Sequence, residues 1–176
     1  MFTNTLRLLK NISQSRWCWL CYIVGSLSLM AAALYFQHAL EELPCLMCIQ
    51  VRLLISLLII VSCAGLLLQG NRVMTSLAHL SVVFIAVSLS ERSYQLLGTE
   101  RGFVFGDCGF DLGLPAWFAI EEWLPWLFRV ETACGYTPEI VFGITMAEML
   151  IVVFGALLLV SFAVFLASIV SLKEPD

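Results

Sequence analysis

The chain has 176 residues, of which 61% are hydrophobic and only 12% are charged, and its mean hydropathy is +0.96. A typical soluble domain is about half apolar and about a quarter charged, so this composition excludes a disordered chain and an ordinary soluble enzyme. The formal net charge of −4 leaves no basic patch for RNA or DNA, and we expect no nucleic-acid partner. The length suits one domain, and the apolar excess predicts that most of it lies in lipid.

Four stretches are long and apolar enough to cross a bilayer as helices, which takes about 20 residues each. They are residues 17–36, 46–68, 73–90 and 144–170. We interpret the first as a retained anchor rather than a cleaved signal peptide, because its apolar region is longer than a signal peptide requires. The sequence therefore predicts a single all-α membrane domain over residues 1–176, a four-transmembrane-helix bundle with a long outer loop.

Lysine and arginine favour the cytoplasmic side of a membrane, so their distribution predicts the orientation of the bundle. With the N-terminus inside, the cytoplasmic side carries Arg7, Lys10, Arg16, Arg72 and Lys173. The outer side then carries Arg92, Arg101 and Arg129, in a loop that also holds eight acidic residues. We expect both termini in the cytoplasm and the loops 37–45 and 91–143 outside.

The loop 91–143 contains a dense group of aromatic residues. They are Phe103, Phe105, Phe110, Trp117, Phe118, Trp123, Trp126 and Phe128. Pro125 prevents one long helix between Ala116 and Phe128, and tryptophan favours the headgroup level of a bilayer. We expect a short interfacial helix lying flat on the membrane, with an aromatic cluster on top of the bundle as the alternative. Both interpretations keep this loop close to the membrane surface.

The predicted topology divides the seven cysteines into two groups. Cys18 and Cys21 lie at the inner end of the first span, and Cys63 lies inside the second. Buried cysteine behaves as a small hydrophobe and the cytosol is reducing, so we assign these three no redox role. The remaining four all lie on the outer side, and they are Cys45, Cys48, Cys108 and Cys134.

Three features distinguish the pair Cys45 and Cys48. Pro44 precedes the pair and suits the opening of a helix, which places both sulfurs in a first turn where the helix dipole favours a thiolate. Arg52 follows Cys48 by four residues, so the two side chains share a helix face. A charge inside an apolar span marks a functional site by default. We prefer this interpretation of Arg52 to the alternative, in which it extends to the outer headgroups.

Cys108 and Cys134 flank the aromatic part of the long loop. A disulfide between them would close about 25 residues and stabilise the loop by roughly 3 kcal/mol. Glycines surround Cys108 and follow Cys134, which leaves room for another protein to reach the sulfurs. An exposed disulfide of this kind takes part in exchange, so we expect more than a structural role for this pair.

Two dithiol pairs on an oxidising face can exchange a disulfide, but the electrons still need a final acceptor. The chain has no glycine-rich motif for flavin or nicotinamide, no motif for covalent haem, and no zinc site of ordinary spacing. His38 and His79 lie near opposite faces, which argues against a haem between them. A quinone dissolved in the bilayer remains. Arg52 would bind a quinone oxygen and stabilise the negative charge that develops on it.

At this point the residues resemble the disulfide bond formation protein B family of bacterial inner-membrane thiol oxidases. The resemblance covers the whole chain. It includes the four spans, Phe36-Gln37-His38 before the first loop, Pro44-Cys45-Leu46-Met47-Cys48 with Arg52, and the pair Cys108 and Cys134 around an aromatic segment. It implies a protein-dithiol:quinone oxidoreductase of the bacterial inner membrane, with ubiquinone or menaquinone as electron acceptor.

The resemblance also implies a role for each cysteine. A periplasmic thioredoxin-like oxidant of the disulfide bond formation protein A type would attack Cys108 and form a mixed disulfide. Cys134 would be released and would pass its electrons to Cys45, and Cys48 would contact the quinone beside Arg52. Two positions depart from the family pattern. Val51 stands where some relatives have an acidic residue, and no histidine occurs in Gly98–Arg101. The resemblance therefore implies the four-cysteine relay but no secondary quinone contacts at these two positions.

Three other interpretations exist, and the order of the cysteines argues against the first. The vitamin K epoxide reductase type also combines helices, quinone and C-x-x-C, but there the loop cysteines come first in the chain. A four-span structural or partner-binding subunit with two permanent loop disulfides is a second alternative. The third is a specialised paralogue serving one dedicated thioredoxin-like partner. The sequence leaves open the kind of quinone, the resting disulfide pairing and the role of Glu148, which we interpret as interfacial rather than as a proton relay.

Overall fold

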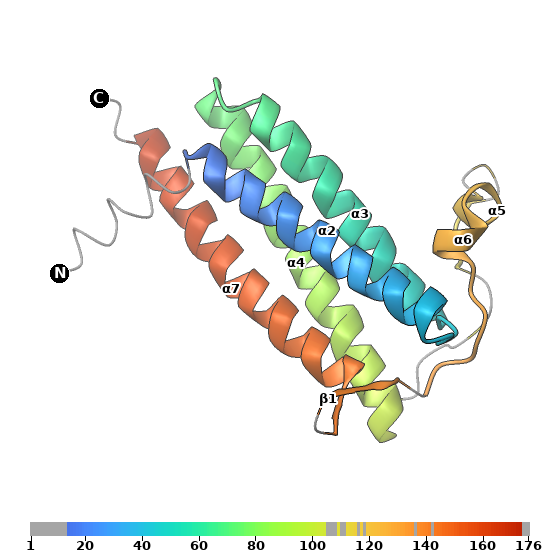
Figure 1. Ribbon diagram of the computed structural model, residues 1–176. Coiled ribbons are helices and arrows are strands. Elements are labelled where there is room, and N and C mark those ends of the chain that lie inside the picture. Colours follow the sequence, from blue (N-terminus) through green and yellow to red (C-terminus); the bar gives the residue numbers. More distant parts are fainter. Residues whose placement is uncertain are drawn as a thin grey trace.

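The computed structural model describes residues 14–104, 109, 112–115, 117, 119–135, 137–141 and 143–173. Four long helices dominate it: α2 (Arg16–Ala39), α3 (Leu46–Leu67), α4 (Arg72–Arg101) and α7 (Met146–Lys173) (Figure 1). All four are long and apolar enough to cross a membrane. The prediction of an all-α, four-helix membrane bundle is thus confirmed.

The helices pack in series, with α2 on α3, α3 on α4, and α4 on α7. A core of buried apolar side chains runs through the bundle, and it includes Trp19, Val51, Ile55, Leu58, Val82, Leu89 and Phe154. Near the start of α2, the Trp19 ring stacks on His79 with 4.4 Å between ring centroids. The same ring fills the space above Gly65 of α3, where a side chain would clash. This contact sets how closely α2 approaches α3.

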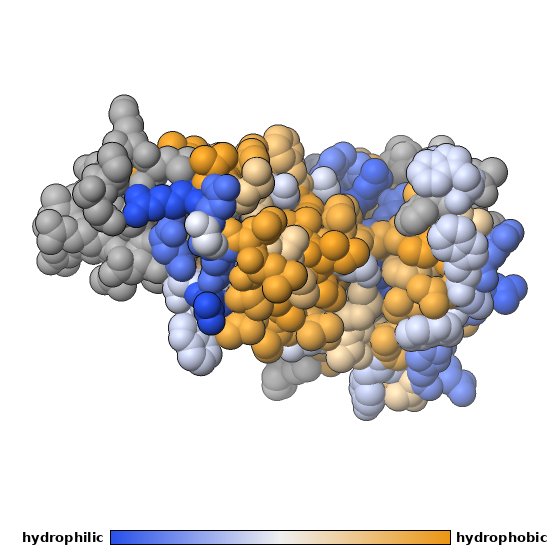
Figure 2. Space-filling view, turned by 90° about the horizontal axis from the view of Figure 1, so that it is seen from above, coloured by the Kyte–Doolittle hydropathy of each residue, from blue (hydrophilic) through white to orange (hydrophobic). Residues whose placement is uncertain are grey.

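The outer surface of the bundle is apolar, as a lipid-facing surface must be. Large hydrophobic side chains are exposed on all four helices, among them Val24, Ile60, Phe84, Val152 and Leu159. Figure 2 shows a broad hydrophobic area over the helices with hydrophilic residues towards both ends. Large exposed apolar areas of this kind mark a membrane or partner surface.

Helix α4 is longer than the third predicted span, because it continues through residues 91–101 before the loop begins. These residues are too polar to be predicted as part of a membrane span, yet they form a helix. Gln95 donates a hydrogen bond to Glu91 one turn earlier, and Leu96 is buried against the bundle. The helix ends at Gly102, whose φ of 76° is the left-handed conformation that favours glycine. The outer loop therefore starts about three turns later than expected.

The described residues between α4 and α7 form four short elements: α5 (Ile120–Trp123), α6 (Pro125–Phe128), β1 (Glu139–Val141) and β2 (Ile144–Thr145). The expected interfacial helix is thus two single turns, which separate at Leu124 because Pro125 opens the second. Trp117, Trp123 and Trp126 are exposed. Strands β1 and β2 pair antiparallel and lead into α7, which begins two residues later than the predicted span. Phe105, Phe110 and Phe118 lie outside the described residues.

Helix direction alternates along the chain, so the connecting segments are divided between the two ends of the bundle (Figure 1). The start of α2, the turn between α3 and α4, and the end of α7 lie at one end. The loop between α2 and α3, the elements α5 and α6, and the strands lie at the other. Both loops predicted to carry redox cysteines are therefore on the same side of the bundle.

Candidate active site

Cys45 and Cys48 form the first turn of α3. Cys45 is the N-cap residue, with an extended backbone, and its Sγ accepts a hydrogen bond of 3.3 Å from the backbone N–H of Cys48. A side-chain acceptor at this position satisfies one of the free amides of a helix start. Cys45 is only 1% exposed, whereas Cys48 is half-buried. The two thiols thus have different access to their surroundings.

The chain segment after α6 brings Cys134 to Cys45. The backbone N–H groups of Glu131 and Thr132 donate hydrogen bonds of 3.0 and 3.3 Å to the carbonyl of Pro44, and Cys45 forms a parallel bridge with Thr132. Cys134 then packs in the same apolar cluster as Cys45 and shares a thiol hydrogen bond with it. Three sulfurs from two distant parts of the chain therefore meet at one end of α3.

Cys45 is central in this group, and its contacts perturb its acidity. The hydrogen bond from Cys134 lowers the pKa of the Cys45 thiol, but the hydrogen bond to Cys48 and burial act in the opposite direction. The net effect raises the pKa of Cys45 to about 12. In the reduced protein Cys45 therefore stays a neutral thiol at physiological pH and can donate its proton towards Cys48.

Cys108, the fourth cysteine predicted to be redox-active, lies outside the described residues, as do the neighbouring residues 105–107. Its pairing with Cys134 remains a prediction. The other three cysteines lie away from the sulfur group along the membrane-spanning helices. Cys21 of α2 and Cys63 of α3 are exposed on the bundle surface, and Cys18 is half-buried.

Arg52 is buried in the second turn of α3, where only 5% of it is exposed. Its guanidinium donates hydrogen bonds to the side-chain oxygen of Gln37 and to two backbone carbonyls, those of Leu127 and Ala33, at 3.1 Å each. It therefore connects α3 with both α2 and α6, and it does not extend to the headgroups. Its charge also lies close enough to interact with Cys48. A buried cation held by three acceptors is fixed in position.

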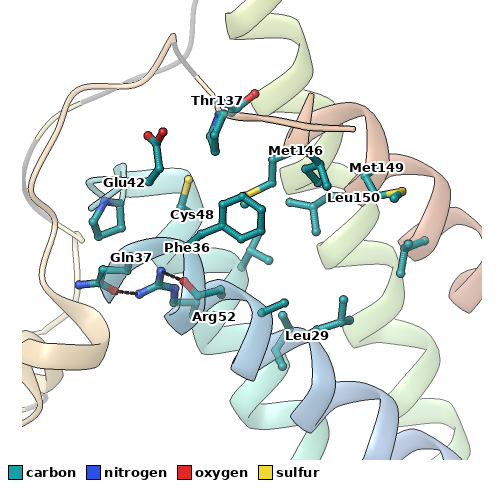
Figure 3. Close-up of a pocket in the computed structure, with 18 of the residues that line it drawn as sticks. Leu29, Phe36, Gln37, Glu42, Cys48, Arg52, Thr137, Met146, Met149 and Leu150 are labelled. Carbon is teal, nitrogen blue, oxygen red and sulfur yellow. Dashed lines mark hydrogen bonds between the residues drawn. The ribbon is translucent and has the colours of Figure 1, made fainter. Parts of the chain in front are cut away.

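A cavity of about 280 Å³ lies directly beside Cys48 and Arg52. Helix α2 contributes Leu29 and Phe36 to its wall, α7 contributes Met149, and the segment before β1 contributes Thr137 (Figure 3). Most of the lining is apolar. The polar lining side chains are Gln37, Glu42, Cys48, Arg52 and Thr137. A mostly apolar cavity with a few convergent polar groups is the usual form of a small-molecule site.

The start of α7 and the end of α4 carry a polar network that the sequence reasoning missed. Thr145 and Glu148 form a capping box, in which each side chain accepts a hydrogen bond from the backbone N–H of the other residue. Glu148 also pairs with Arg101, and the hydroxyls of Thr137 and Thr145 both donate to Glu100. The signal was present as T-x-x-E before an apolar run. Glu148 is thus engaged in capping and in an ion pair.

Comparison with known proteins identifies one family. The family model described as Disulfide bond formation protein DsbB matches residues 15–164. The protein named Disulfide bond formation protein B of Psychromonas ingrahamii is 34% identical over 166 residues, which are 90% of this chain and 88% of that protein. Its namesakes in Shewanella amazonensis and Photorhabdus laumondii are 32% and 30% identical. They align with 86% and 96% of this chain and with 90% and 99% of their own lengths.

These matches confirm the family resemblance inferred from the cysteine and arginine pattern. The four apolar helices agree with a multi-pass protein of the bacterial inner membrane. The chain therefore belongs to the disulfide bond formation protein B family, whose general role is disulfide bond formation in the membrane.

Proposed function

We propose that the chain is a protein-dithiol:quinone oxidoreductase. It takes two electrons from a periplasmic thioredoxin-like dithiol protein, of the disulfide bond formation protein A type, and passes them to ubiquinone or menaquinone in the bilayer. One observation carries this proposal. Cys48 and Cys134 both pack against the cluster that contains Cys45, and Cys48 also lines an apolar cavity together with Arg52.

The proposed electron path runs by thiol–disulfide exchange. The partner's thiolate attacks Cys108 of a Cys108–Cys134 disulfide, which forms a mixed disulfide and releases Cys134. The partner's second thiolate then displaces Cys108, so the partner leaves oxidised and this chain holds two more electrons. Cys134 attacks Cys45 of a Cys45–Cys48 disulfide and frees the Cys48 thiolate, and Cys108 then displaces Cys45 and restores its own bond to Cys134. The contact between Cys45 and Cys134 supports this order of attack.

The residues around the cavity fit a quinone head group. The cavity of about 280 Å³ is near the lower limit of ordinary ligand pockets, and its walls are mainly apolar. When bound there, a quinone supplies a two-electron acceptor. Arg52 would hold a quinone oxygen and favour negative charge on it, Gln37 would keep the guanidinium in place, and Cys48 would face the ring.

The proposal is tested with purified protein, a reduced thioredoxin-like dithiol protein and a water-soluble ubiquinone analogue, whose absorbance reports reduction. We expect turnover by the wild type and none by Cys48→Ser. Cys63→Ser is the matched control, because Cys63 lies on the same helix but is exposed on the bundle surface, and it should turn over like the wild type. If the wild type reduces no quinone with any dithiol partner, the proposal is wrong and a structural subunit with permanent disulfides is the better account.

A further inference from the structure

A second cavity adjoins the first, and the two share part of their walls. It has a volume of about 500 Å³, lies at the same end of the bundle, and is lined by polar residues that include Glu100, Glu139 and Thr145. Three residues line both cavities, namely Glu42, Thr137 and Pro138. These three therefore separate a polar outer space from the apolar space beside Cys48.

Of these three residues, only Glu42 carries an ionisable side chain. Pro138 has no donor, and the Thr137 hydroxyl is already committed, because it donates to the carboxylate of Glu100. Among the residues that the structure describes, none donates a hydrogen bond to the Glu42 carboxylate. Figure 3 shows this carboxylate at the same end of the inner cavity as Cys48 and Thr137. Glu42 is thus able to face either cavity.

The local backbone places Glu42 at this wall. Glu41 has a φ of 56°, which is the left-handed conformation. At this turn the backbone N–H of Glu42 donates a hydrogen bond of 3.1 Å to the carbonyl of Phe36. The Glu41 side chain is exposed and lines neither cavity, whereas Glu42 is half-buried and lines both. Two adjacent glutamates therefore differ in their surroundings, which provides a matched pair for experiment.

Quinone reduction requires protons as well as electrons. In each cycle two partner thiols become a disulfide and release two electrons and two protons, and the quinone takes up two electrons and two protons. The inner cavity is mostly apolar, and among the described residues that line it Glu42 is the one with a carboxyl group. We propose that Glu42 delivers the protons: its carboxyl group gives a proton to a quinone oxygen in the inner cavity and regains one from water in the outer cavity.

This inference rests on the proposed function and adds one residue to it. Other ionisable side chains line these cavities with Glu42, and they are Cys48 and Arg52 in the inner cavity and Glu100 and Glu139 in the outer one. A carboxyl group that lines both cavities can take up a proton on one side and release it on the other, as general acid–base catalysis requires.

The kinetic test compares Glu42→Gln with Glu41→Gln. Each protein is reduced beforehand, separated from the dithiol partner and mixed with the water-soluble ubiquinone analogue, so that only the last step is measured. We expect Glu42→Gln to slow this step by about 100-fold, the lower end of what a positioned acid contributes, with unchanged quinone affinity. Glu41→Gln should match the wild type. Glu42→Asp keeps an ionisable group and should retain much of the rate with a displaced pH profile.

A second measurement does not depend on turnover. Infrared difference spectra of the oxidised protein, recorded while the quinone analogue binds, should show a carboxyl band that shifts in the wild type and in Glu41→Gln and is missing in Glu42→Gln. If this band is insensitive to Glu42→Gln, or if that variant keeps the wild-type rate and pH profile, Glu42 delivers no protons. Should Glu42→Gln fail to fold, an unaltered rate and pH profile in Glu42→Asp would overturn the inference equally. A wild type that reduces no quinone would instead refute the proposed function itself.

Discussion

The side chain of Arg52 has two functions that are difficult to separate by inspection, since it lines the cavity and also joins three helices. Its hydrogen bonds to Gln37, Leu127 and Ala33 use the planar, forked donors of a guanidinium. A lysine ammonium at this position keeps the charge but has a single nitrogen, which cannot reach acceptors on two sides. Substitution by lysine therefore tests the geometry of the donors and not the charge alone.

We predict that Arg52→Lys raises the KM for the quinone analogue about tenfold and lowers the free energy of unfolding by about 1–3 kcal/mol, because buried acceptors lose their partner. The measurements are quinone titration of the oxidase assay and thermal unfolding in detergent. Arg16→Lys serves as the control, because Arg16 is exposed and should tolerate the change. An Arg52→Lys protein with wild-type KM and stability would show that charge alone is sufficient here.

Local sequence spacing predicted part of this site. Cys45, Cys48 and Arg52 belong to one helix, so their separation along the chain determines which of them share a face. Glu42 was not predicted as part of the site, because its position depends on the left-handed turn at Glu41 and on contact with residues 137–138. The meeting of Cys134 with Cys45 depends in the same way on hydrogen bonds between distant segments. Such contacts have no signature in residue spacing.

At the scale of elements, hydropathy predicted the membrane spans, but a helix can extend beyond its span. Residues 46–68 were predicted and α3 covers Leu46–Leu67, because apolar character begins and ends with that helix. The predicted span 73–90 is shorter than α4, because side-chain hydrogen bonds and the burial of Leu96 stabilise the polar last turns of that helix without lipid. A lipid criterion therefore cannot detect where such a helix ends, whereas Gly102 could have indicated it.

One close contact between α2 and α3 requires a glycine. A Cβ atom added at Gly65 would lie 2.5 Å from carbons of the Trp19 ring, and that ring is completely buried. We predict that Gly65→Ala forces the helices apart and destabilises the protein by about 1–3 kcal/mol, as overpacking of a core does. Thermal unfolding in detergent, followed by tryptophan fluorescence, measures the effect.

Gly25 of α2 provides the matched control for this prediction. It also lies in the middle of a helix, but an added Cβ there would meet nothing within 4 Å. Gly25→Ala should therefore be neutral or stabilising by about 0.5–1 kcal/mol, because alanine is the better helix former. Equal effects of the two substitutions would mean that helix propensity, and not the Trp19 contact, decides the outcome.

For the whole molecule, the arrangement orders the redox groups along one direction. The outer loop holds Cys134 against the cluster of Cys45, and Cys45 and Cys48 lie at the start of α3. The cavity that Cys48 lines continues between α2 and α7 (Figure 3). Electrons that arrive from a soluble partner would therefore leave towards the membrane interior. This direction is useful only if the cysteine end of the bundle faces the oxidising side.

We therefore predict that the cysteine end lies in the periplasm and both chain termini in the cytoplasm. The excess of Lys and Arg at the other end supports this orientation, because positive residues resist translocation. Alkaline phosphatase, which needs disulfides to be active, should be inactive when fused after Asp176 of the full chain and active when inserted after Trp123, an exposed position of α5. Green fluorescent protein fused after Asp176 should fluoresce. The reverse pattern would place Cys45 and Cys48 in the reducing cytosol, where thiol oxidation by the proposed route could not serve a periplasmic partner.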